Sequence, residues 1–343
     1  MDNFYALLLA GGHGSRLWPV SQPSHPKPLI SLTEPRTLFE MTIDRLDGLF
    51  TPEQTYVVTQ QDLLDSLIQL TPTIPSCNYV CEPTSLNTGP AIGLAVSYII
   101  QQHPDAVIAI MSTDHVIEQT DVLHEALQAA YSLAKQGAMV VLGVTPTHPA
   151  TEYGYIEHGA IIPDATIPAY AVRRFVEKPD PVTAAAFFAT GSYSWDAGFV
   201  TASVKTLLAE FERLQPTMAK ILNEMSWIST EDEIKNELWR QITPISFDYG
   251  ILEHAAQVVV IPVEMGWQDI GSWGAIYNEL PKNKCGNAYV ASQPPVLIET
   301  RRTLVWSERQ VVTIGVEDLV IVETADALLI CHRDHLQHIR SIG

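Results

Sequence analysis

The sequence is poor in positive charge. Only 20 Lys and Arg residues stand against 39 Asp and Glu residues, which gives a net charge of −19 over 343 residues. A protein that binds duplex nucleic acid through its phosphates normally carries a basic surplus, so the composition disfavours a nucleic-acid partner. If the ligand is a polyphosphate, a few local cations and a metal ion must outweigh this acidic field.

Long apolar runs and cysteine pairs are also missing. No apolar run approaches the roughly 18 residues that a membrane-spanning helix needs, and the first four residues, MDNF, lack the basic segment of a signal peptide. The four cysteines form no CxxC pair and have no His cluster at zinc-ligand spacing beside them: Cys77, Cys81, Cys285 and Cys331. We therefore expect reduced thiols in a cytoplasmic protein that has no membrane partner.

Apolar residues make up 46% of the chain, which is enough for a large core, and this length corresponds to about two domains. In the first half, apolar β-like runs alternate with amphipathic stretches. Strands are predicted at 4–10, 56–59, 106–111 and 138–144, and helices at 37–46, 90–103 and 121–135. This alternation predicts an α/β fold with a mostly parallel sheet covered on both faces. Ligands of such sheets collect where strands end, here after residues 10 and 111.

The alternation of predicted strands and helices becomes less regular after residue 151. Strands are predicted at 153–156, 171–176 and 197–201, and helices at 181–189, 204–213, 218–225 and 249–256. Short β-rich pieces then follow without long helices, at 295–299, 304–307, 311–314, 319–323 and 327–331. This change in the predicted elements indicates a domain at 1–283 and a small β-rich domain at 284–343. No fixed repeat period is evident there, so a β-helix is only one form that the second domain could take.

The strongest local signal is a glycine-rich loop after the first strand, within the sequence LLAGGHGSRLWP at 8–19. Three glycines in four positions let backbone N–H groups converge on an anion without obstruction by a Cβ atom. Arg16 adds a bidentate donor for phosphate oxygens, and the prolines on both sides of Lys27 can hold a second cation near the loop. The spacing fits neither the P-loop nor the dinucleotide fingerprint. A purely steric tight turn is the alternative, which the two cations disfavour.

This loop, together with PKP at 26–28, resembles the signature of sugar-1-phosphate nucleotidylyltransferases. Its LWP variant is similar to the mannose-1-phosphate guanylyltransferases in particular. The resemblance recurs in order along nearly the whole chain, in EP at 82–83, NTGPAI at 87–92, STDHVI at 112–117, YGYI at 153–156, FVEKPD at 175–180, WDAGF at 195–199, DY at 248–249 and DIGSW at 269–273. It implies a Rossmann-like, doubly wound mixed sheet of the nucleotide-diphospho-sugar transferase type with a small C-terminal β domain.

The resemblance implies an enzyme that transfers GMP from GTP to α-D-mannose 1-phosphate, giving GDP-mannose and pyrophosphate. The expected reaction is a Mg²⁺-dependent in-line displacement in which Arg16 and Lys27 stabilise the triphosphate and the leaving group. Two alternatives stay open. The chain could use another sugar 1-phosphate or another nucleoside triphosphate, or it could be a catalytically silent subunit that binds GDP-mannose. We further expect copies of the chain to form a homo-oligomer through the C-terminal domain.

Two aspartates are the candidate metal ligands. Asp114 follows a predicted buried strand, where a carboxylate can hold Mg²⁺ or, equally well by residue type, cap the next helix. The resemblance decides in favour of the metal. It also implies that Asp269, which would otherwise be read as a turn residue, is the second ligand. Both His13 in the loop and His115 beside Asp114 are predicted to be structural or peripheral.

The other candidate residues divide between nucleotide and sugar phosphate. The nucleotide candidates are Leu9, Ala10, Gly11, Gly12, Gly14, Ser15, Glu82, Asn87 and Thr88. Glu82 is the candidate for reading guanine, because one carboxylate can accept both N1–H and the exocyclic amine; a surface Glu is the equal alternative. For the sugar phosphate, the resemblance implies Gly154, Glu177, Lys178 and Asp196.

Two positions depart from the family pattern. Asp196 stands where relatives usually have Asn, and a carboxylate accepts hydrogen bonds but cannot donate one. The choice of sugar is therefore less defined than the nucleotide chemistry. Leu86 stands where many relatives have Arg, so a phosphate contact is weakened unless another basic side chain replaces it.

Overall fold

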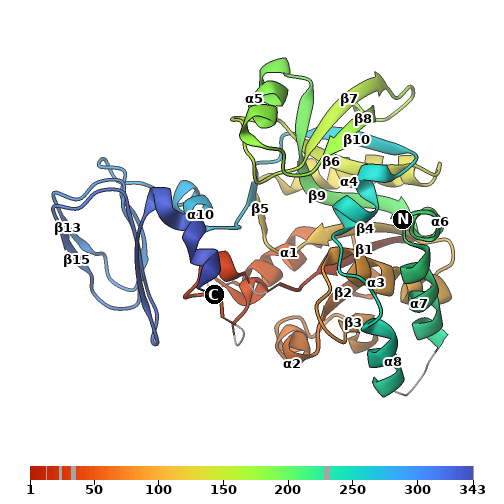
Figure 1. Ribbon diagram of the computed structural model, residues 1–343, viewed down its shortest axis with the longest axis horizontal. Coiled ribbons are helices and arrows are strands. Elements are labelled where there is room, and N and C mark those ends of the chain that lie inside the picture. The colour runs from red at the N-terminus through yellow and green to blue at the C-terminus, as the bar shows by residue number, and fades with distance from the viewer. Residues whose placement is uncertain (13, 23–24, 32–35, 228–231, 343) are drawn as a thin grey trace. The chain divides into compact units, whose positions relative to one another are not determined.

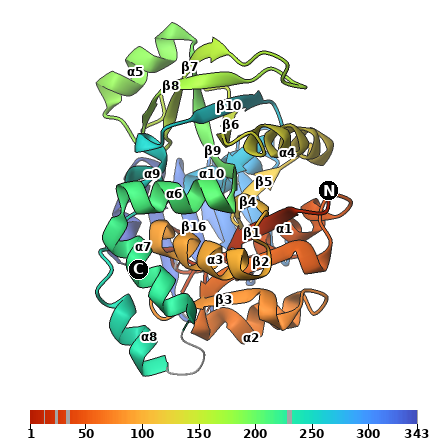
Figure 2. The same ribbon diagram turned by 90° about the vertical axis from the view of Figure 1, so that its right-hand side faces the viewer.

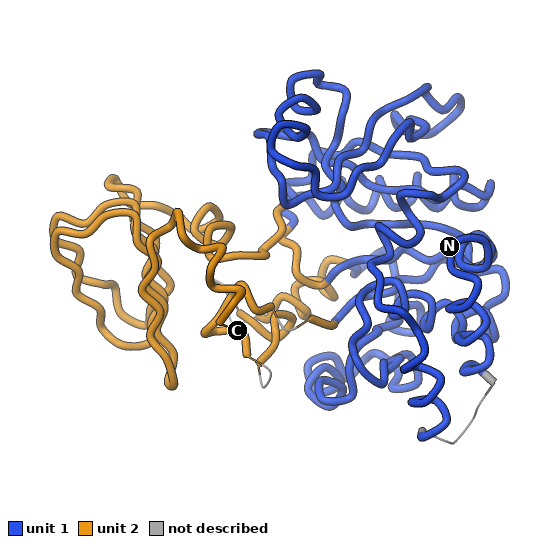
Figure 3. Tube along the Cα trace, viewed as in Figure 1, with its two compact units in different colours: residues 1–10, 46–112, 117–267 blue, residues 11–45, 113–116, 268–343 orange. Residues whose placement is uncertain are grey.

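The computed structural model describes residues 1–12, 14–22, 25–31, 36–227 and 232–342, so His13 lies outside the described residues. The chain forms two compact units (Figure 3). Unit 1 comprises residues 1–10, 46–112 and 117–267, and unit 2 comprises residues 11–45, 113–116 and 268–343.

Unit 1 is built on a nine-stranded sheet with the strand order β3-β2-β1-β4-β9-β6-β10-β8-β7 (Figure 1). The strands are β1 (Phe4–Leu9), β2 (Thr55–Gln60), β3 (Tyr79–Glu82), β4 (Val107–Ser112), β6 (Met139–Val144), β7 (Tyr155–Ile161), β8 (Tyr170–Val176), β9 (Tyr193–Ser203) and β10 (Val258–Val263). The first four strands of this order are mutually parallel, as are β6 and β10. Strand β9 runs antiparallel to β4 and β6, and β8 runs antiparallel to β7 and β10. The predicted doubly wound α/β fold with a mixed sheet is confirmed.

Helices cover both faces of this sheet (Figure 2). Helices α3 (Thr88–Gln102), α6 (Val204–Leu214) and α7 (Pro216–Trp227) pack together on one face, over alternate apolar side chains of the strands. Helix α4 (Thr120–Ala134) packs against β4, β6, β9 and β10 on the other face. Helix α8 (Asp232–Trp239) buries Trp239, whose Nε1 donates to the carbonyl of Thr84 at 2.8 Å. This hydrogen bond holds the loop between β3 and α3.

Three further helical segments of unit 1 agree with the sequence-based predictions to different degrees. Helix α5 (Pro181–Thr190) begins where predicted, with the Asp180 side chain accepting hydrogen bonds from two backbone N–H groups as N-cap. Helix α2 (Gln61–Leu70) was not predicted. The helix predicted at 249–256 is wrong in extent, because the chain forms only α9 (Phe247–Gly250) and a 3₁₀ turn at Leu252–His254.

Unit 2 begins with the glycine-rich loop and two 3₁₀ turns, η1 (Ser15–Leu17) and η2 (Lys27–Leu29). Helix α1 (Leu38–Leu46) starts with the predicted capping box, because the Thr37 N–H donates to Glu40 Oε2 at 2.8 Å and the Glu40 N–H donates to Thr37 Oγ1 at 3.1 Å. The later elements are α10 (Trp273–Glu279), β12 (Ala288–Ala291), β13 (Val296–Ile298), β14 (Leu304–Ser307), β15 (Val312–Ile314), β16 (Leu319–Glu323), β17 (Leu328–His332) and η6 (Arg333–Ser341).

The C-terminal strands stack as parallel coils of 16 residues. Ala288 pairs with Leu304, which pairs with Val320, and Val296 pairs with Val312 in a second two-stranded sheet. The coils form a short β-solenoid in which the aligned Ala288, Leu304 and Val320 are buried, whereas the aligned Val296 and Val312 are exposed. Strand β17 pairs antiparallel with β16.

All four cysteines are free thiols. Among the helices of the described residues, none combines the length and the apolar character needed to cross a lipid bilayer.

Candidate active site

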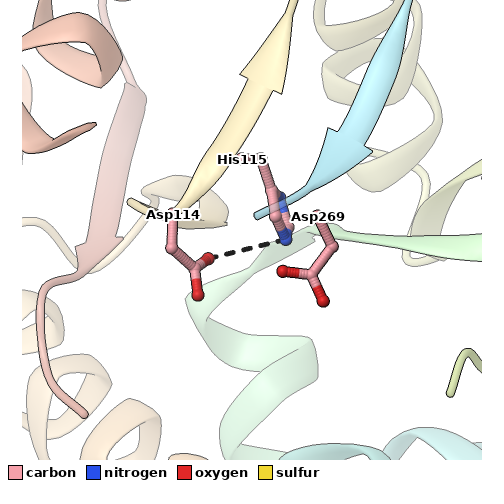
Figure 4. Close-up of side chains that lie close together, drawn as sticks. All are labelled: Asp114, His115 and Asp269. Atoms are coloured by element: carbon pink, nitrogen blue, oxygen red, sulfur yellow. Dashed lines mark ion pairs between the residues drawn. The ribbon is translucent and has the colours of Figure 1, made fainter. Parts of the chain in front are cut away.

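An acidic centre in unit 2 is formed by Asp114, His115 and Asp269 (Figure 4). One ligand atom from each residue lies within 4.8 Å of the other two. Strand β5 (His115–Ile117) pairs with β11 (Trp267–Asp269), and the Ile270 N–H donates to the Asp114 carbonyl at 3.3 Å. This two-stranded ribbon brings together two aspartates that are far apart in the sequence.

Lys27 reaches both carboxylates of this centre. Its Nζ lies 2.5 Å from Asp114 Oδ2 and 3.4 Å from Asp269 Oδ1, and the residue is only 8% exposed. Gly14 has a φ of +61°, and a Cβ atom there would lie 2.7 Å from Ser21 Oγ and 2.9 Å from Lys27 Cβ. Glycine at this position therefore lets the loop approach the lysine. The structure thus brings Gly14, Lys27 and both aspartates together.

The charges of the acidic centre depend on one another. Burial alone would raise the pKa of the Asp114 carboxyl, but the positive charges of Lys27 and His115 outweigh it and lower that pKa to about 2. Burial opposes the charge of Lys27, yet the two carboxylates keep its pKa above the ordinary value. Burial lowers the pKa of His115, so its ring is neutral at pH 7 and carries its positive charge only in acid, where Asp114 also titrates.

The donor set fits a hard divalent cation. Asp114 Oδ1 is buried and has no hydrogen-bond partner, so it is available to a metal ion. Mg²⁺ favours one or two carboxylates completed by phosphate oxygens and water, which Asp114 and Asp269 can offer. His115 was predicted to be structural or peripheral, whereas its Nε2 lies 3.6 Å from Asp114 Oδ1 inside the cluster. Its place next to Asp114 was the signal that sequence reasoning did not use.

Arg16 lies on the 3₁₀ turn η1 and is exposed. A Cβ atom at Gly271 would lie 2.9 Å from Asp269 Oδ2 and 3.3 Å from Arg16 Nη2, so both groups lie against the same short stretch of backbone. The indole N–H of Trp273 donates to the Trp18 carbonyl at 2.9 Å and fixes the end of the loop. The Arg16 guanidinium therefore stands beside the acidic centre.

The other loop residues place backbone groups at the end of the first strand. Leu9 ends β1, and the Ala10 N–H donates to the Val58 carbonyl at 2.9 Å. Gly11 and Gly12 are exposed, and Gly12 has a φ of +107° with nothing within 4 Å of an added Cβ. Ser15 opens η1. The backbone at Gly11 and Gly12 is therefore open to solvent, as an anion-binding loop requires.

Asn87 and Thr88 lie at the start of α3. Asn87 is the N-cap, with a φ of 79°, and its side chain accepts the Thr88 N–H at 2.8 Å. The Thr88 hydroxyl accepts the N–H of Phe247 at 2.8 Å and so ties α3 to α9.

Glu82 ends β3 and is 5% exposed, so it is a buried group and not the surface carboxylate of the alternative. Its Oε2 has no hydrogen-bond partner. Burial raises the pKa of Glu82 to about 7, although a hydrogen bond from the Leu86 backbone lowers it in part. The side chain lines a cavity of about 590 Å³ that Tyr98 and Lys235 also line.

The four sugar-phosphate candidates converge within unit 1. The Asp196 N–H donates to the Gly154 carbonyl at 2.8 Å. A Cβ atom at Gly154 would lie 2.7 Å from Glu177 Oε2 and 3.4 Å from Asp196 Cβ, so glycine lets both acidic side chains approach this backbone. Lys178, with a φ of 45°, donates a hydrogen bond to the Glu177 carboxylate. The structure therefore brings these four residues together.

Asp248 of α9, for which no role was predicted, joins this group. Burial raises the pKa of Asp196 well above its ordinary value, and the nearby charges of Asp248 and Glu177 add to this. Burial and Glu177 also raise the pKa of Asp248 to about 6. In its neutral form a carboxylic acid can donate a hydrogen bond, which an ionised carboxylate cannot. The DY pair at 248–249, part of the resemblance, was the available signal.

Comparisons with known proteins agree with this geometry. The family model described as Nucleotidyl transferase matches residues 5–284, and the model described as MannoseP isomerase/GMP-like beta-helix domain matches residues 294–342. A mannose-1-phosphate guanylyltransferase of Escherichia coli is 33% identical over 346 residues, covering 97% of this chain and 72% of the relative. One of Salmonella typhimurium is 33% identical over 348 residues, covering 99% of this chain and 72% of the relative. The crystal structure of a protein of Thermus thermophilus, described as a mannose-1-phosphate geranyltransferase, superposes with a TM-score of 0.89 at 29% identity, covering 99% of this chain and 98% of that one.

Proposed function

Because the chain belongs to the nucleotidyl transferase family, and within it to the mannose-1-phosphate guanylyltransferases, we propose that it transfers GMP from GTP to α-D-mannose 1-phosphate. The products are GDP-mannose and pyrophosphate, which makes the chain a transferase of nucleotide-sugar biosynthesis. The observation that carries the proposal is the contact of Lys27 with Asp114 and Asp269 behind the glycine-rich loop. Cations and carboxylates in this arrangement suit a metal-bound triphosphate.

The reaction needs positioning and charge neutralisation more than proton transfer. A phosphate oxygen of the sugar phosphate attacks the α-phosphorus of GTP. One P–O bond forms while the bond to the bridging oxygen of the departing pyrophosphate breaks in line with it. The attacking oxygen is already anionic at neutral pH, so no side chain has to remove a proton. The enzyme must hold the two reactants in line and offset the charge that grows on the leaving group.

The glycine-rich loop and the acidic centre supply these electrostatic functions. The backbone N–H groups of Gly11, Gly12, Gly14 and Ser15 bind phosphate oxygens, and Leu9 and Ala10 hold the nucleotide at the strand end. The Arg16 guanidinium donates to the triphosphate. Lys27 has three N–H donors, so it can keep its Asp114 contact and still donate to a phosphate oxygen. Asp114 and Asp269 would hold Mg²⁺, which supplies Lewis-acid neutralisation of the phosphates when bound.

Unit 1 supplies substrate recognition. Lys178 binds the phosphate of the sugar phosphate, Glu177 accepts hydrogen bonds from sugar hydroxyls, and the Gly154 backbone lies against the sugar. Asp196 donates a hydrogen bond in its neutral form. Asn87 and Thr88 contact the nucleotide, and Glu82 accepts the two adjacent N–H groups of guanine. The pKa of about 7 leaves a large share of Glu82 ionised at neutral pH, as this contact requires.

We also propose that copies of the chain associate through the β-rich domain at 284–343, which is distinct from the catalytic domain at 1–283. The outer face of the two-stranded sheet β13–β15 carries four apolar side chains that are 40–64% exposed: Val296, Ile298, Val312 and Ile314. A second copy that offers the same face would bury them.

The substrate assignment is tested by measuring pyrophosphate release from a panel of nucleoside triphosphates and sugar 1-phosphates. We expect the highest kcat/KM for GTP with α-D-mannose 1-phosphate. Asp114→Asn should abolish the Mg²⁺-dependent rate, whereas the control Asp105→Asn, at an exposed carboxylate paired with Lys205, should not. A better rate with another pair would correct the substrate. GDP-mannose binding without pyrophosphate release from any pair would show a silent subunit.

A further inference from the structure

Residues 245–248, which we call the strap, are joined to the start of helix α3 by two hydrogen bonds. The Gly89 N–H donates to the Ile245 carbonyl at 3.0 Å, and the Phe247 N–H donates to the Thr88 hydroxyl at 2.8 Å. Both bonds use backbone atoms of the strap, and both partners belong to unit 1. The path of the strap is therefore fixed against α3 at two points, whatever side chains it carries.

The close approach of the strap depends on the missing side chain of Gly89. A Cβ atom at this position would lie 2.7 Å from the Ile245 carbonyl oxygen and 3.2 Å from Ile245 Cγ2. The carbonyl oxygen belongs to the backbone, so it cannot rotate out of the way as the end of a flexible side chain can. Gly89 has no positive φ, so glycine is needed here for close packing and not for a special backbone conformation. Alanine would separate the strap from α3.

The far end of the strap reaches the sugar-phosphate candidates. Phe247 is 2% exposed and packs in the core, with its ring centroid 6.1 Å from that of Phe211. The next residue is Asp248, whose carboxyl lies near enough to Asp196 and Glu177 for their charges to interact. The strap thus connects the start of α3 to a carboxyl group beside these candidates.

The strap is the weaker of the two partners. Helix α3 has 15 residues, ten of which are buried, and the Asn87 side chain caps its first turn. Helix α9, which contains the end of the strap, has four residues. A single turn has few hydrogen bonds of its own, whereas a long buried helix is held along its whole length. A clash between the two would therefore move the strap and leave the nucleotide candidates at the start of α3 in place.

We propose that Gly89 is a positioning residue for the sugar 1-phosphate, because it lets the strap hold Asp248 beside Asp196. The inference rests on the proposed function, in which Asp196 binds the sugar in its neutral form. Gly89 is buried and has no side chain, so it acts on the sugar only through the strap. A substitution there should weaken the binding of the sugar 1-phosphate and spare the nucleotide.

The charges around Asp196 explain why the place of Asp248 matters. Burial raises the pKa of Asp196, the nearby charges of Asp248 and Glu177 raise it further, and the positive charge of Lys178 opposes them. A strap that moved away from α3 would change the distance of Asp248 from this group. With the Asp248 charge withdrawn, a smaller fraction of Asp196 would keep the proton that it donates to the sugar.

The test measures pyrophosphate release with the nucleoside triphosphate and the sugar 1-phosphate that the wild type uses best. We expect Gly89→Ala to raise the KM for the sugar 1-phosphate at least about tenfold, while the KM for the nucleoside triphosphate changes less than about twofold. The matched control is Gly159→Ala in the β7–β8 pair, where a Cβ atom would lie 2.8 Å from the Ala171 carbonyl oxygen. This clash is of the same kind but does not involve the strap, so both KM values should stay as in the wild type.

The proposed function and this inference fail in different ways. An active wild type with an unchanged KM for the sugar 1-phosphate in Gly89→Ala would overturn the positioning role alone. A wild type that releases no pyrophosphate from any pair of substrates would overturn both. Circular dichroism checks that the variants fold. If Gly89→Ala does not, Thr88→Val replaces it, because it removes the acceptor of the Phe247 N–H, and Thr88→Ser should restore the KM for the sugar 1-phosphate.

A double-mutant cycle tests whether Gly89 acts through Asp248. Asp248→Ala should raise the KM for the sugar 1-phosphate by itself, and adding Gly89→Ala should raise it less than about twofold further. Single effects that multiply in the double variant would place the action of Gly89 elsewhere. An unchanged KM in Asp248→Ala would exclude the strap as its route. Either result would overturn the proposal.

Discussion

Lys27 lies between the two carboxylates of the acidic centre, and its charge balances theirs. Without it, Asp114 and Asp269, whose side chains are 28% and 24% exposed, would face each other with their repulsion uncompensated. Removing one partner of a fully buried ion pair typically costs about 3–5 kcal/mol, and the cost is smaller here because solvent screens the remaining carboxylates in part. A metal ion that binds the same carboxylates would replace this lost compensation.

We therefore predict that Lys27→Met lowers the melting temperature in the presence of EDTA and that saturating Mg²⁺ restores much of the loss. Its kcat should fall by about 10²–10³-fold, the usual effect of removing one preorganised donor. Differential scanning calorimetry with and without Mg²⁺ measures the first effect. Lys205→Met is the control, because Lys205 pairs with Asp105 on the surface. A Mg²⁺-induced shift no larger in Lys27→Met than in the wild type would contradict the shared metal site.

Glu82 predicts a pH dependence of stability. Its pKa is about 7 in the folded protein because of burial, against 4.5 ordinarily, so the folded state retains a proton that the unfolded state loses. The contribution of Glu82 to the free energy of unfolding is therefore most favourable at low pH and falls as the pH rises from about 4.5 to 7. Glu82→Gln removes this titration. The difference in the free energy of unfolding between the variant and the wild type should therefore change in favour of the variant by up to about 3 kcal/mol between low pH and pH 8.

Urea unfolding across this pH range measures the effect. The exposed Glu237→Gln serves as the control and should leave the pH profile unchanged. Parallel profiles for Glu82→Gln and the wild type would show that Glu82 is ionised in the folded state.

At the scale of elements, the glycine-rich loop depends on backbone freedom and close approach. Gly14 combines a φ of +61° with a Cβ position that Ser21 and Lys27 obstruct. We predict that Gly14→Ala lowers kcat at least about 100-fold, because the loop must move away from Lys27, which holds the charges that the reaction uses. Pyrophosphate release measures this change.

Gly48→Ala is the matched control for this prediction. Gly48 has a φ of +81°, but no atom lies within 4 Å of an added Cβ. It should lose about 1 kcal/mol of stability through the left-handed backbone alone and keep its activity. Equal losses of activity at both positions would mean that the close approach at Gly14 has no special role.

The elements that the sequence predicted are those with strong local signals. Strand β1, helix α1 with its capping box, and the C-terminal strands from β13 to β17 were found to within about two residues. The order of strands was not predictable, since the antiparallel insertion of β9 between β4 and β6 depends on long-range packing. The 3₁₀ helix η6 was missed because its period of three reads as irregular under templates of two and 3.6.

The candidate site residues also divide into those that have a signal in the sequence and those whose role depends on the folded chain. The loop, Lys27 and both aspartates carry local signals or a family resemblance, and the structure brings Lys27 to the aspartates. For Asp248 the family resemblance of the DY pair was the available signal, but its effect on Asp196 could not be predicted, because that effect arises from burial and from charge proximity in the folded chain.

At the scale of the whole molecule, the proposed association through sheet β13–β15 can be tested by charge. We predict that Val312→Lys/Ile314→Lys yields monomers, because two ammonium groups would have to be buried on that face. Sedimentation velocity measures the mass. Val182→Lys on α5, where Val182 is 80% exposed, is the control and should keep the wild-type mass. A monomeric wild type, or unchanged mass in the double variant, would remove the assignment.

The reversal of direction at β17 has a consequence for how the solenoid ends. Parallel coils could otherwise add rung after rung, and an uncovered last rung would offer its free backbone groups to any neighbouring chain. Because β17 returns antiparallel along β16, that template is blocked. A truncation before residue 328 would expose it, and we expect the shortened chains to polymerise into fibres where the intact protein stays dispersed.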